Sequence, residues 1–252
     1  METLILTPHD LWLQITLNRP EAKNALNTAT LAALAAALQA ATADANIRAV
    51  LLHGAEGNFA AGADITEIEG KTSAQAATDP RKVHWAAIRA FPKPLIAAVD
   101  GFALGGGLEL ALMADLMILG DSARLGLPET NLGLIPGAGG TQRLLALAGR
   151  ARASRMILSG EIIDADTAHA WGIAAYRATG AALPDAIALA EKIALRAPLA
   201  LQAAKAALVA GDESPRAFPL ERAGFEALMD TADKAEGIAA FRAKRKPQFK
   251  GQ

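Results

Sequence analysis

Two glutamates lie in apolar passages of the 252-residue chain. Glu109 lies in residues 108–114, where a helix would be apolar nearly all round, and Glu129 follows Pro128 inside the apolar passage 125–134. Such a helix is buried, and burial raises the pKa of a carboxyl group toward neutral pH. Two carboxyls of this kind suit paired general acid and base catalysis. Each glutamate alone has a plainer explanation: Glu109 as an acidic residue favoured near a helix N-terminus, and Glu129 as a loop residue that accepts backbone hydrogen bonds. The prediction therefore rests on the pair.

A triple glycine, Gly105 to Gly107, precedes Glu109. Gly106 lies at the predicted helix start, where unpaired N–H groups and the helix dipole can bind a phosphate or a developing oxyanion. A tightly packed turn is the alternative use of three glycines. The glycine patterns of dinucleotide-binding loops and phosphate loops are absent from the sequence.

The elements that position these residues alternate between strands and helices. Residues 95–99 form a short apolar run before Asp100 and Gly101, which predicts a buried strand that ends in a turn. Residues 11–17 and 49–53 are further predicted strands. Between them Asn27 is placed to cap an alanine-rich helix that runs to about Ala43. Strand, helix and strand at this spacing predict an α/β domain.

Four long segments resemble the crotonase family, and specifically its enoyl-CoA hydratases. They are residues 18–27 (NRPEAKNALN), 58–65 (NFAAGADI), 93–112 (KPLIAAVDGFALGGGLELAL) and 126–144 (GLPETNLGLIPGAGGTQRL). The resemblance covers essentially the whole chain in order. It implies the family's fold, a ββα spiral over residues 1–195 that carries the CoA-thioester site, followed by a C-terminal helical oligomerisation region over residues 196–252.

The resemblance also implies roles for individual residues. The peptide N–H groups of Ala63 and Gly106 would form the oxyanion hole, Glu109 would activate the water, and Glu129 would deliver the proton. The substrate-binding residues implied by the same motifs are Lys23, Ala25, Ala61, Asp64, Ile65, Thr66 and Gly105. Asp64 has an equally good explanation as the N-cap of the following helix.

Coenzyme A belongs to the substrate, so the resemblance implies no separate cofactor and no metal. Lys23, Lys244 and Lys246 are candidates for contact with the phosphates of coenzyme A, the last two on a neighbouring subunit. A solvated helix end that complements the helix dipole is the alternative for the run from Lys244 to Lys246.

The acyl end of the substrate is expected near residues 70–80, which are predicted as a mobile loop. The resemblance extends to the hydratases of phenylacetate breakdown, whose substrate ends in a carboxylate. Burying that charge requires a partner, and Arg81, Lys82, His84 and Arg89 are the candidates. The solvated face of a helix is the alternative, above all for Arg89.

Composition excludes several other classes of protein. The chain has 25 basic and 26 acidic residues and no cysteine, so it has no field that favours nucleic acid, no disulfide and no thiolate nucleophile. It shows no targeting segment and no apolar run long enough for a membrane helix, which predicts a cytoplasmic protein outside the membrane. None of the four histidines lies in a metal-like pair, and the three tryptophans are expected in the core or at contacts.

The last part of the chain is predicted to be helical, with Pro198 starting one helix and further helices at residues 222–229 and 235–245. Apolar residues such as Phe225, Leu228 and Phe241 would be partly exposed in a monomer. The family's helices in this region build trimers that pair into hexamers, so self-association is expected.

The predicted activity is hydration of a 2-enoyl-CoA to a 3-hydroxyacyl-CoA, with an acyl-CoA as the small-molecule partner. A double-bond isomerase of the same fold is the nearest alternative, although an isomerase can work with one carboxylate. A non-catalytic homologue that binds RNA and a purely structural oligomer are the other two. The near-neutral charge disfavours the RNA binder, and the two retained glutamates disfavour the structural oligomer.

Overall fold

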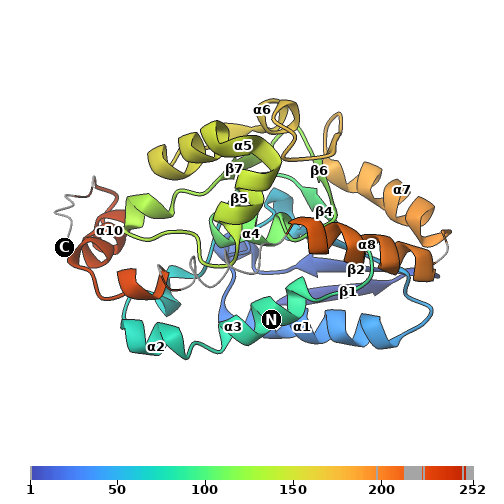
Figure 1. Cartoon of the computed structure of the whole chain (residues 1–252), viewed down its shortest axis with the longest axis horizontal. Coiled ribbons are helices and arrows are strands. Elements are labelled where there is room, and N and C mark those ends of the chain that lie inside the picture. The colour runs from blue at the N-terminus through green and yellow to red at the C-terminus, as the bar shows by residue number, and fades with distance from the viewer. Residues whose placement is uncertain (1, 197, 213–222, 224, 246, 248–252) are drawn as a thin grey trace.

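The computed structural model describes residues 2–196, 198–212, 223, 225–245 and 247 (Figure 1). The strands are β1 Leu4–Pro8, β2 Trp12–Leu17, β3 Ala49–Gly54, β4 Leu95–Val99, β5 Phe102–Leu104, β6 Leu116–Leu119, β7 Arg124–Gly126, β8 Ile163–Asp164 and β9 Tyr176–Arg177. The α-helices are α1 Thr28–Ala43, α2 Ser73–Ala77, α3 Arg81–Arg89, α4 Gly106–Ala111, α5 Gly140–Ser159, α6 Ala165–Ala170, α7 Ala182–Ala194, α8 Pro198–Asp212 and α10 Ala232–Arg242. Short 3-10 helices are η1 Pro20–Ala22, η2 Ala55–Gly57, η3 Ile65–Glu67 and η4 Glu129–Leu132.

A six-stranded sheet with the order β1-β2-β3-β4-β6-β9 forms the centre of the molecule. β1 runs antiparallel to β2, and the other neighbours run parallel. Parallel strands are joined by crossovers whose helices cover both faces of the sheet, so strands of this kind are apolar on both sides. All five residues of β4 are accordingly buried.

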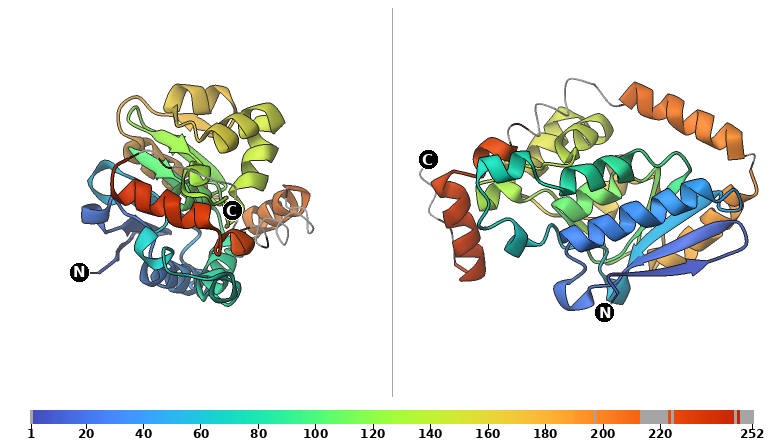
Figure 2. Two further views of the ribbon diagram at one scale, coloured as in Figure 1. Left: turned by 90° about the vertical axis from the view of Figure 1, so that its left-hand side faces the viewer. Right: turned by 90° about the horizontal axis from the view of Figure 1, so that it is seen from below.

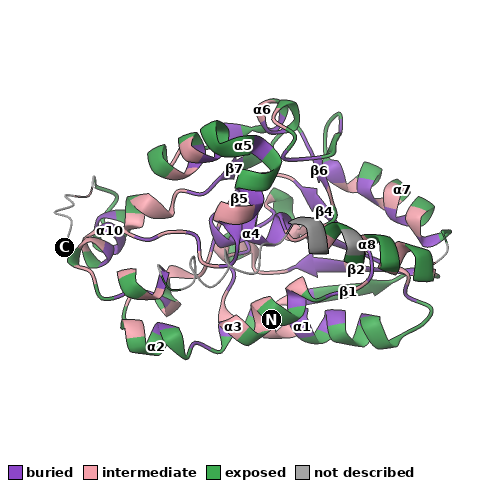
Figure 3. Cartoon of the chain, viewed as in Figure 1, coloured by how far each residue is buried: buried purple, intermediate pink, exposed green. Residues whose placement is uncertain are grey.

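Alternate residues of the strands pack on opposite faces of this sheet. On one face Leu52 and Ala97 belong to the main core with residues of α1, and on the other Leu51 and Ile96 pack with α7. The buried face of α7 carries alanines at positions 182, 186, 190 and 194, one per helical turn, which lets the helix lie close to the sheet. Figures 2 and 3 show helices on both sides of the sheet, with their exposed faces outward.

A second, three-stranded sheet with the order β5-β7-β8 contacts α4 through β5 and α6 through β7 and β8. Two isolated parallel bridges, Ala60 with Ala103 and Leu26 with Ala63, tie the loop after β3 to this sheet and to the start of α1. They therefore bring the residues around Ala63 beside the strand that leads into α4.

The predicted strands at residues 49–53 and 95–99 are confirmed, and Asn27 caps α1 by accepting a hydrogen bond from Thr30 N. The helix predicted at residues 108–114 was too long at its C-terminal end, because α4 ends at Ala111. After α4, the carboxylate of Asp115 accepts a hydrogen bond from the backbone N of Leu95, the first residue of β4. This bond holds the chain beside β4 just before β6 begins.

The predicted loop at residues 70–80 was wrong in part, since it contains α2. A capping box between Thr72 and Gln75 starts this helix, and Ala76 is fully buried. Asp79, which follows the helix, is buried as well. Packing of these two residues against the rest of the molecule gives the segment a defined place.

The C-terminal helix α10 packs against η4 of its own chain. A Cβ on Gly237 would lie only 2.4 Å from the backbone of Leu132, so the helix and η4 are in close contact. The ammonium of Lys234 donates hydrogen bonds to the carbonyls of Glu69 and Lys71 at 3.1 and 3.0 Å. The predicted helix start at Arg222 and the candidate Lys246 lie outside the described residues.

Candidate active site

One cavity receives side chains or backbone from the loop after β3, α3, the start of α4, the passage 128–138 and the C-terminal segment. Its described lining residues are Ala61, Gly62, Ala63, Ile65, Ile68, Arg81, Trp85, Leu104, Gly105, Gly106, Glu109, Pro128, Glu129, Leu132, Leu134, Ile135, Gly137, Ala138, Phe225 and Phe241. Most of these are apolar, while the two glutamates are the only acidic groups among them. A mostly apolar cavity with a few convergent polar groups is typical of a small-molecule site.

Glu109 lies in α4, whose six residues are all buried. Its own exposed fraction is 4%. The carboxylate Oε1 accepts hydrogen bonds from Ala138 N at 2.7 Å and from Gly140 N, the first residue of α5, at 2.9 Å. Two backbone donors compensate the burial of the carboxylate and fix its orientation.

Glu129 is the first residue of η4 and is partly buried. A Cβ built on Gly105 would lie 3.2 Å from Glu129 Oε1, so this carboxyl lies against the backbone at the start of α4. A Cβ on Gly140 would lie 3.1 Å from Oε1 of Glu109, which lines the same cavity. The structure thus brings together two carboxyls that are twenty residues apart in the sequence.

The peptide nitrogens of Ala63 and Gly106 also meet at this cavity. A Cβ on Gly106 would lie 3.4 Å from Ala63 N. The residues before them, Gly62 and Gly105, have positive φ angles of 128° and 49°, a conformation that glycine adopts without strain. Neither N–H donates a hydrogen bond to any backbone carbonyl that the structure describes outside the regular elements. Two convergent N–H donors are suited to a developing oxyanion.

The other predicted substrate-binding residues divide into two groups. Ala61, Ile65 and Gly105 line the cavity, whereas Lys23, Ala25, Asp64 and Thr66 lie outside its lining. They lie close by, because the backbone of Lys23 and Leu26 bonds to that of residues 61–64. The ammonium of Lys23 lies 5.0 Å from the centre of the Phe102 ring.

Asp64 caps η3 by accepting hydrogen bonds from Thr66 N and Thr66 Oγ1 at 3.2 and 2.7 Å. It also pairs with Arg19 at 3.0 Å. Burial alone would raise the pKa of this carboxyl, but the bonds from Thr66 and Arg19 outweigh burial and lower it. The plain N-cap explanation therefore accounts for Asp64 locally.

The four candidate partners of a distal carboxylate are separated by the structure. Arg81 lines the cavity, and Trp85, one turn further along α3, lines it as well. Lys82 instead donates to Glu226 at 2.8 Å and to the carbonyl of Ala77 at 2.9 Å. His84 and Arg89 are not among the lining residues.

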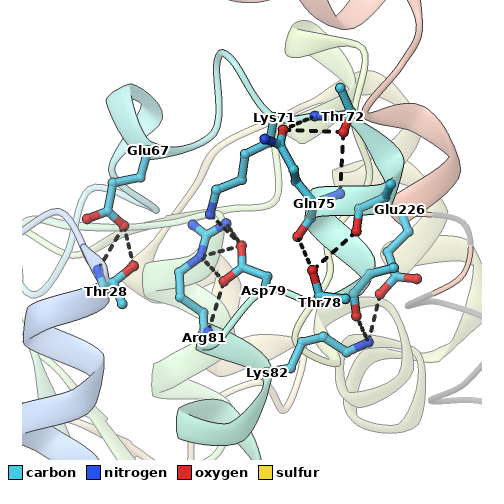
Figure 4. A network of polar contacts seen from close by, with 12 residues as sticks. Thr28, Glu67, Lys71, Thr72, Gln75, Thr78, Asp79, Arg81, Lys82 and Glu226 are labelled. Atoms are coloured by element: carbon cyan, nitrogen blue, oxygen red, sulfur yellow. Dashed lines mark hydrogen bonds and ion pairs between the residues drawn. The ribbon is translucent and has the colours of Figure 1, made fainter.

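Arg81 is bound by a carboxylate that the sequence did not single out (Figure 4). Asp79 accepts hydrogen bonds from Arg81 Nε and Nη2 at 3.0 and 2.6 Å, and from Lys71 Nζ at 2.6 Å. Burial alone would raise the pKa of Asp79, but these two cations hold it well below its usual range. Trp85 and Asp79 are thus site residues that sequence reasoning missed. The only available signal was the four-residue spacing from Arg81 to Trp85 on a helix.

Among the described residues no three His, Asp or Glu side chains are grouped to bind a metal. None of the described helices combines the length and the apolar character needed to cross a bilayer. The polar groups that the described lining residues bring to the cavity are carboxyls, peptide N–H groups and one guanidinium.

Residues 11–252 match the sequence model of the enoyl-CoA hydratase/isomerase family. The chain belongs to this family. A 2,3-dehydroadipyl-CoA hydratase of Escherichia coli is 47% identical over the full length of both chains. A probable enoyl-CoA hydratase of Rhizobium meliloti is 44% identical over 99% of this chain and 98% of the relative.

Solved structures of the enoyl-CoA hydratase/isomerase family agree with the fold. A carnitinyl-CoA hydratase from Mycobacterium avium superposes with a TM-score of 0.89 at 35% identity, over the whole of both chains. An enoyl-CoA hydratase/isomerase from Pseudoalteromonas atlantica gives the same TM-score at 31% identity, over 98% of this chain and 100% of the other. The crotonase-like fold predicted from the sequence motifs is therefore confirmed.

Proposed function

We propose that the chain adds water across the 2,3 double bond of a 2-enoyl-CoA thioester and forms the 3-hydroxyacyl-CoA. The single observation that carries this proposal is the convergence of Glu109 and Glu129 on one cavity with the N–H groups of Ala63 and Gly106. Family membership and full-length relatives that are named as hydratases support the same activity.

The oxyanion hole acts on the thioester carbonyl. Hydrogen bonds from Ala63 N–H and Gly106 N–H draw electron density toward the carbonyl oxygen, which makes C3 of the conjugated double bond electrophilic. As the oxygen of water bonds to C3, negative charge develops on the carbonyl oxygen as an enolate. Fixed peptide dipoles stabilise that charge more than the ground state, and this difference lowers the barrier.

The two glutamates handle the protons. Glu109, oriented by Ala138 N and Gly140 N, accepts a proton from the attacking water. Glu129, which lines the same cavity, delivers a proton to C2 as the enolate collapses. The hydroxyl thus ends at C3 and the new hydrogen at C2, and the same groups in reverse order catalyse dehydration.

Turnover of crotonyl-CoA tests this proposal, because hydration removes the absorbance of the conjugated enoyl thioester. We expect that absorbance to fall on addition of the protein. If it instead rises with a 3-enoyl-CoA while 2-enoyl-CoA is left untouched, the chain is an isomerase and the hydration proposal is wrong.

For the acyl group we propose a six-carbon chain with a terminal carboxylate, such as 2,3-dehydroadipyl-CoA. Support comes from the name of the 47% identical relative and from the guanidinium of Arg81 in the cavity wall. A panel of enoyl-CoA substrates of different length, with and without a terminal carboxylate, measures this preference directly.

We also propose that the chain assembles into a trimer or a hexamer. Three leucine side chains are highly exposed: Leu195, Leu199 and Leu208, with exposed fractions of 75%, 79% and 73%. Exposed apolar side chains of this kind support a contact with another copy of the chain.

A further inference from the structure

The cavity wall contains a guanidinium whose position is fixed. Arg81 has an exposed fraction of 7% and lines the same cavity as Glu109 and Glu129. Its backbone N also donates to Asp79, so the carboxylate binds both ends of the residue. A side chain held by hydrogen bonds at both ends loses little further entropy when it binds a ligand.

One side of this guanidinium is left for another acceptor. Nε and Nη2 bind Asp79, whereas Nη1 donates no hydrogen bond within the described part of the chain. Arg81 also forms no ion pair with Glu109 or Glu129, and its carboxylate partner is Asp79. The guanidinium is therefore separate from the reacting carboxyls, with two N–H donors of Nη1 remaining.

The charges around Arg81 do not balance. Lys71 and Arg81 both bind the single carboxylate of Asp79, which leaves one positive charge in excess. Lys82 does not change this balance, because Glu226 neutralises it. A carboxylate of a bound ligand beside Arg81 would neutralise this net positive charge.

We propose that Arg81, oriented by Asp79, is the residue that determines specificity for an anionic distal end of the acyl chain. The ligand class is a 2-enoyl-CoA whose acyl group ends in a carboxylate, which accepts hydrogen bonds from Nη1. Arg81 takes no part in the proton transfers. The assignment rests on the proposed hydration and adds to it the group that distinguishes carboxylated from uncharged chains.

The test compares kcat/KM for 2,3-dehydroadipyl-CoA and for hex-2-enoyl-CoA, which have the same chain length. The wild type favours the carboxylated substrate. Arg81→Ala lowers that preference by roughly 10-fold to 100-fold, as for loss of a charged hydrogen bond, and the loss appears mainly in KM because the interaction exists before the reaction. Arg81→Lys restores part of the preference.

Lys82→Ala is the matched control, because it removes a neighbouring cation that binds Glu226 outside the cavity. The Lys82→Ala variant should show the same ratio of kcat/KM between the two substrates as the wild type. If Arg81→Ala does not fold, the test is inhibition of crotonyl-CoA hydration by saturated acyl-CoA compounds in the wild type. We expect adipyl-CoA, which ends in a carboxylate, to inhibit at a lower concentration than hexanoyl-CoA, and equal inhibition would contradict the assignment.

Two results separate this assignment from the proposed function. If the wild type hydrates crotonyl-CoA but prefers hex-2-enoyl-CoA, or if Lys82→Ala alters the preference as much as Arg81→Ala, the assignment of Arg81 is wrong and hydration stands. If the wild type hydrates no enoyl-CoA at all, both proposals fail.

Discussion

Replacing Gly140 by alanine would place a methyl group against the side chain of Glu109. The new Cβ would lie 2.9 Å from Glu109 Cγ and 3.2 Å from Leu127 Cδ1. Carbon atoms in contact prefer about 3.5–4.0 Å, so Glu109 must move by roughly 0.6–1 Å. Gly140 N is also one of the two donors that orient this carboxylate. The substitution therefore shifts the proposed base without altering any charge.

The substitution is expected to lower both the rate of hydration and the stability of the fold. A displacement of about 1 Å in a reacting group can lower a rate by about 10²-fold, so we expect kcat to fall by that order. Overpacking costs about 1–3 kcal/mol, but alanine in a helix is about 1 kcal/mol better than glycine. Gly140 is the first residue of α5 and has no positive φ, so part of this gain applies. The gain offsets only part of the cost, so we expect the free energy of unfolding to fall by about 0.5–2.5 kcal/mol.

The assay is hydration of crotonyl-CoA together with urea unfolding of the same preparation. Gly70→Ala is the matched control, because a Cβ at Gly70 meets nothing within 4 Å and its φ is not positive. The control should keep the wild-type kcat and stability. A Gly140→Ala variant with wild-type kcat would refute the idea that the backbone at the start of α5 positions Glu109.

Three further predictions concern the reacting pair, the buried acid and the assembly. Glu109→Gln and Glu129→Gln should each fold, bind acyl-CoA and lose roughly 10²-fold to 10⁴-fold in kcat, and the double variant should lose far less than the product of the two if one water is shared. Asp79→Asn should lower the free energy of unfolding at neutral pH by roughly 3 kcal/mol, as for a broken buried ion pair. Since the folded pKa of Asp79 lies below its unfolded value of about 3.9, its stabilisation is full above that pH and is lost as pH falls, so urea unfolding should show the variant and the wild type converging in acid. Sedimentation at micromolar concentration should show a trimer or a hexamer, and a well-behaved monomer would contradict the proposed assembly.

Much of the central sheet was predictable because its strands are apolar on both faces. The run at residues 95–99 is short, apolar and bounded by turn residues, so β4 could be recognised from local sequence. Asn27 gave the start of α1 in the same way. By contrast β5 and β7 have three residues each and show no periodicity of their own. They are strands only because folding places them side by side.

The candidate site was predictable where its residues are close in sequence or lie in long motifs. Glu109 and Gly106 belong to one motif, and Glu129 lies in an apolar passage that made it conspicuous. The Arg81–Asp79 pair was not predictable, because neither the burial of Asp79 nor the third partner, Lys71, follows from local pattern. Phe225 and Phe241 lie more than 80 residues after Glu129 in the sequence, and only the fold brings them to the same cavity wall. Their place in the site was therefore not predictable either.

The cavity is assembled from parts of the chain that can vary independently. Its carboxyls and N–H donors belong to Ala63, Gly106, Glu109 and Glu129, whereas Phe225 and Phe241 come from the C-terminal segment and Arg81 and Trp85 from α3. Changes in α3 or in the C-terminal segment alter the shape and charge of the wall while α4 and its glycines stay as they are. A library restricted to those two segments is therefore a direct route to new acyl-group selectivity on an unchanged proton-transfer apparatus.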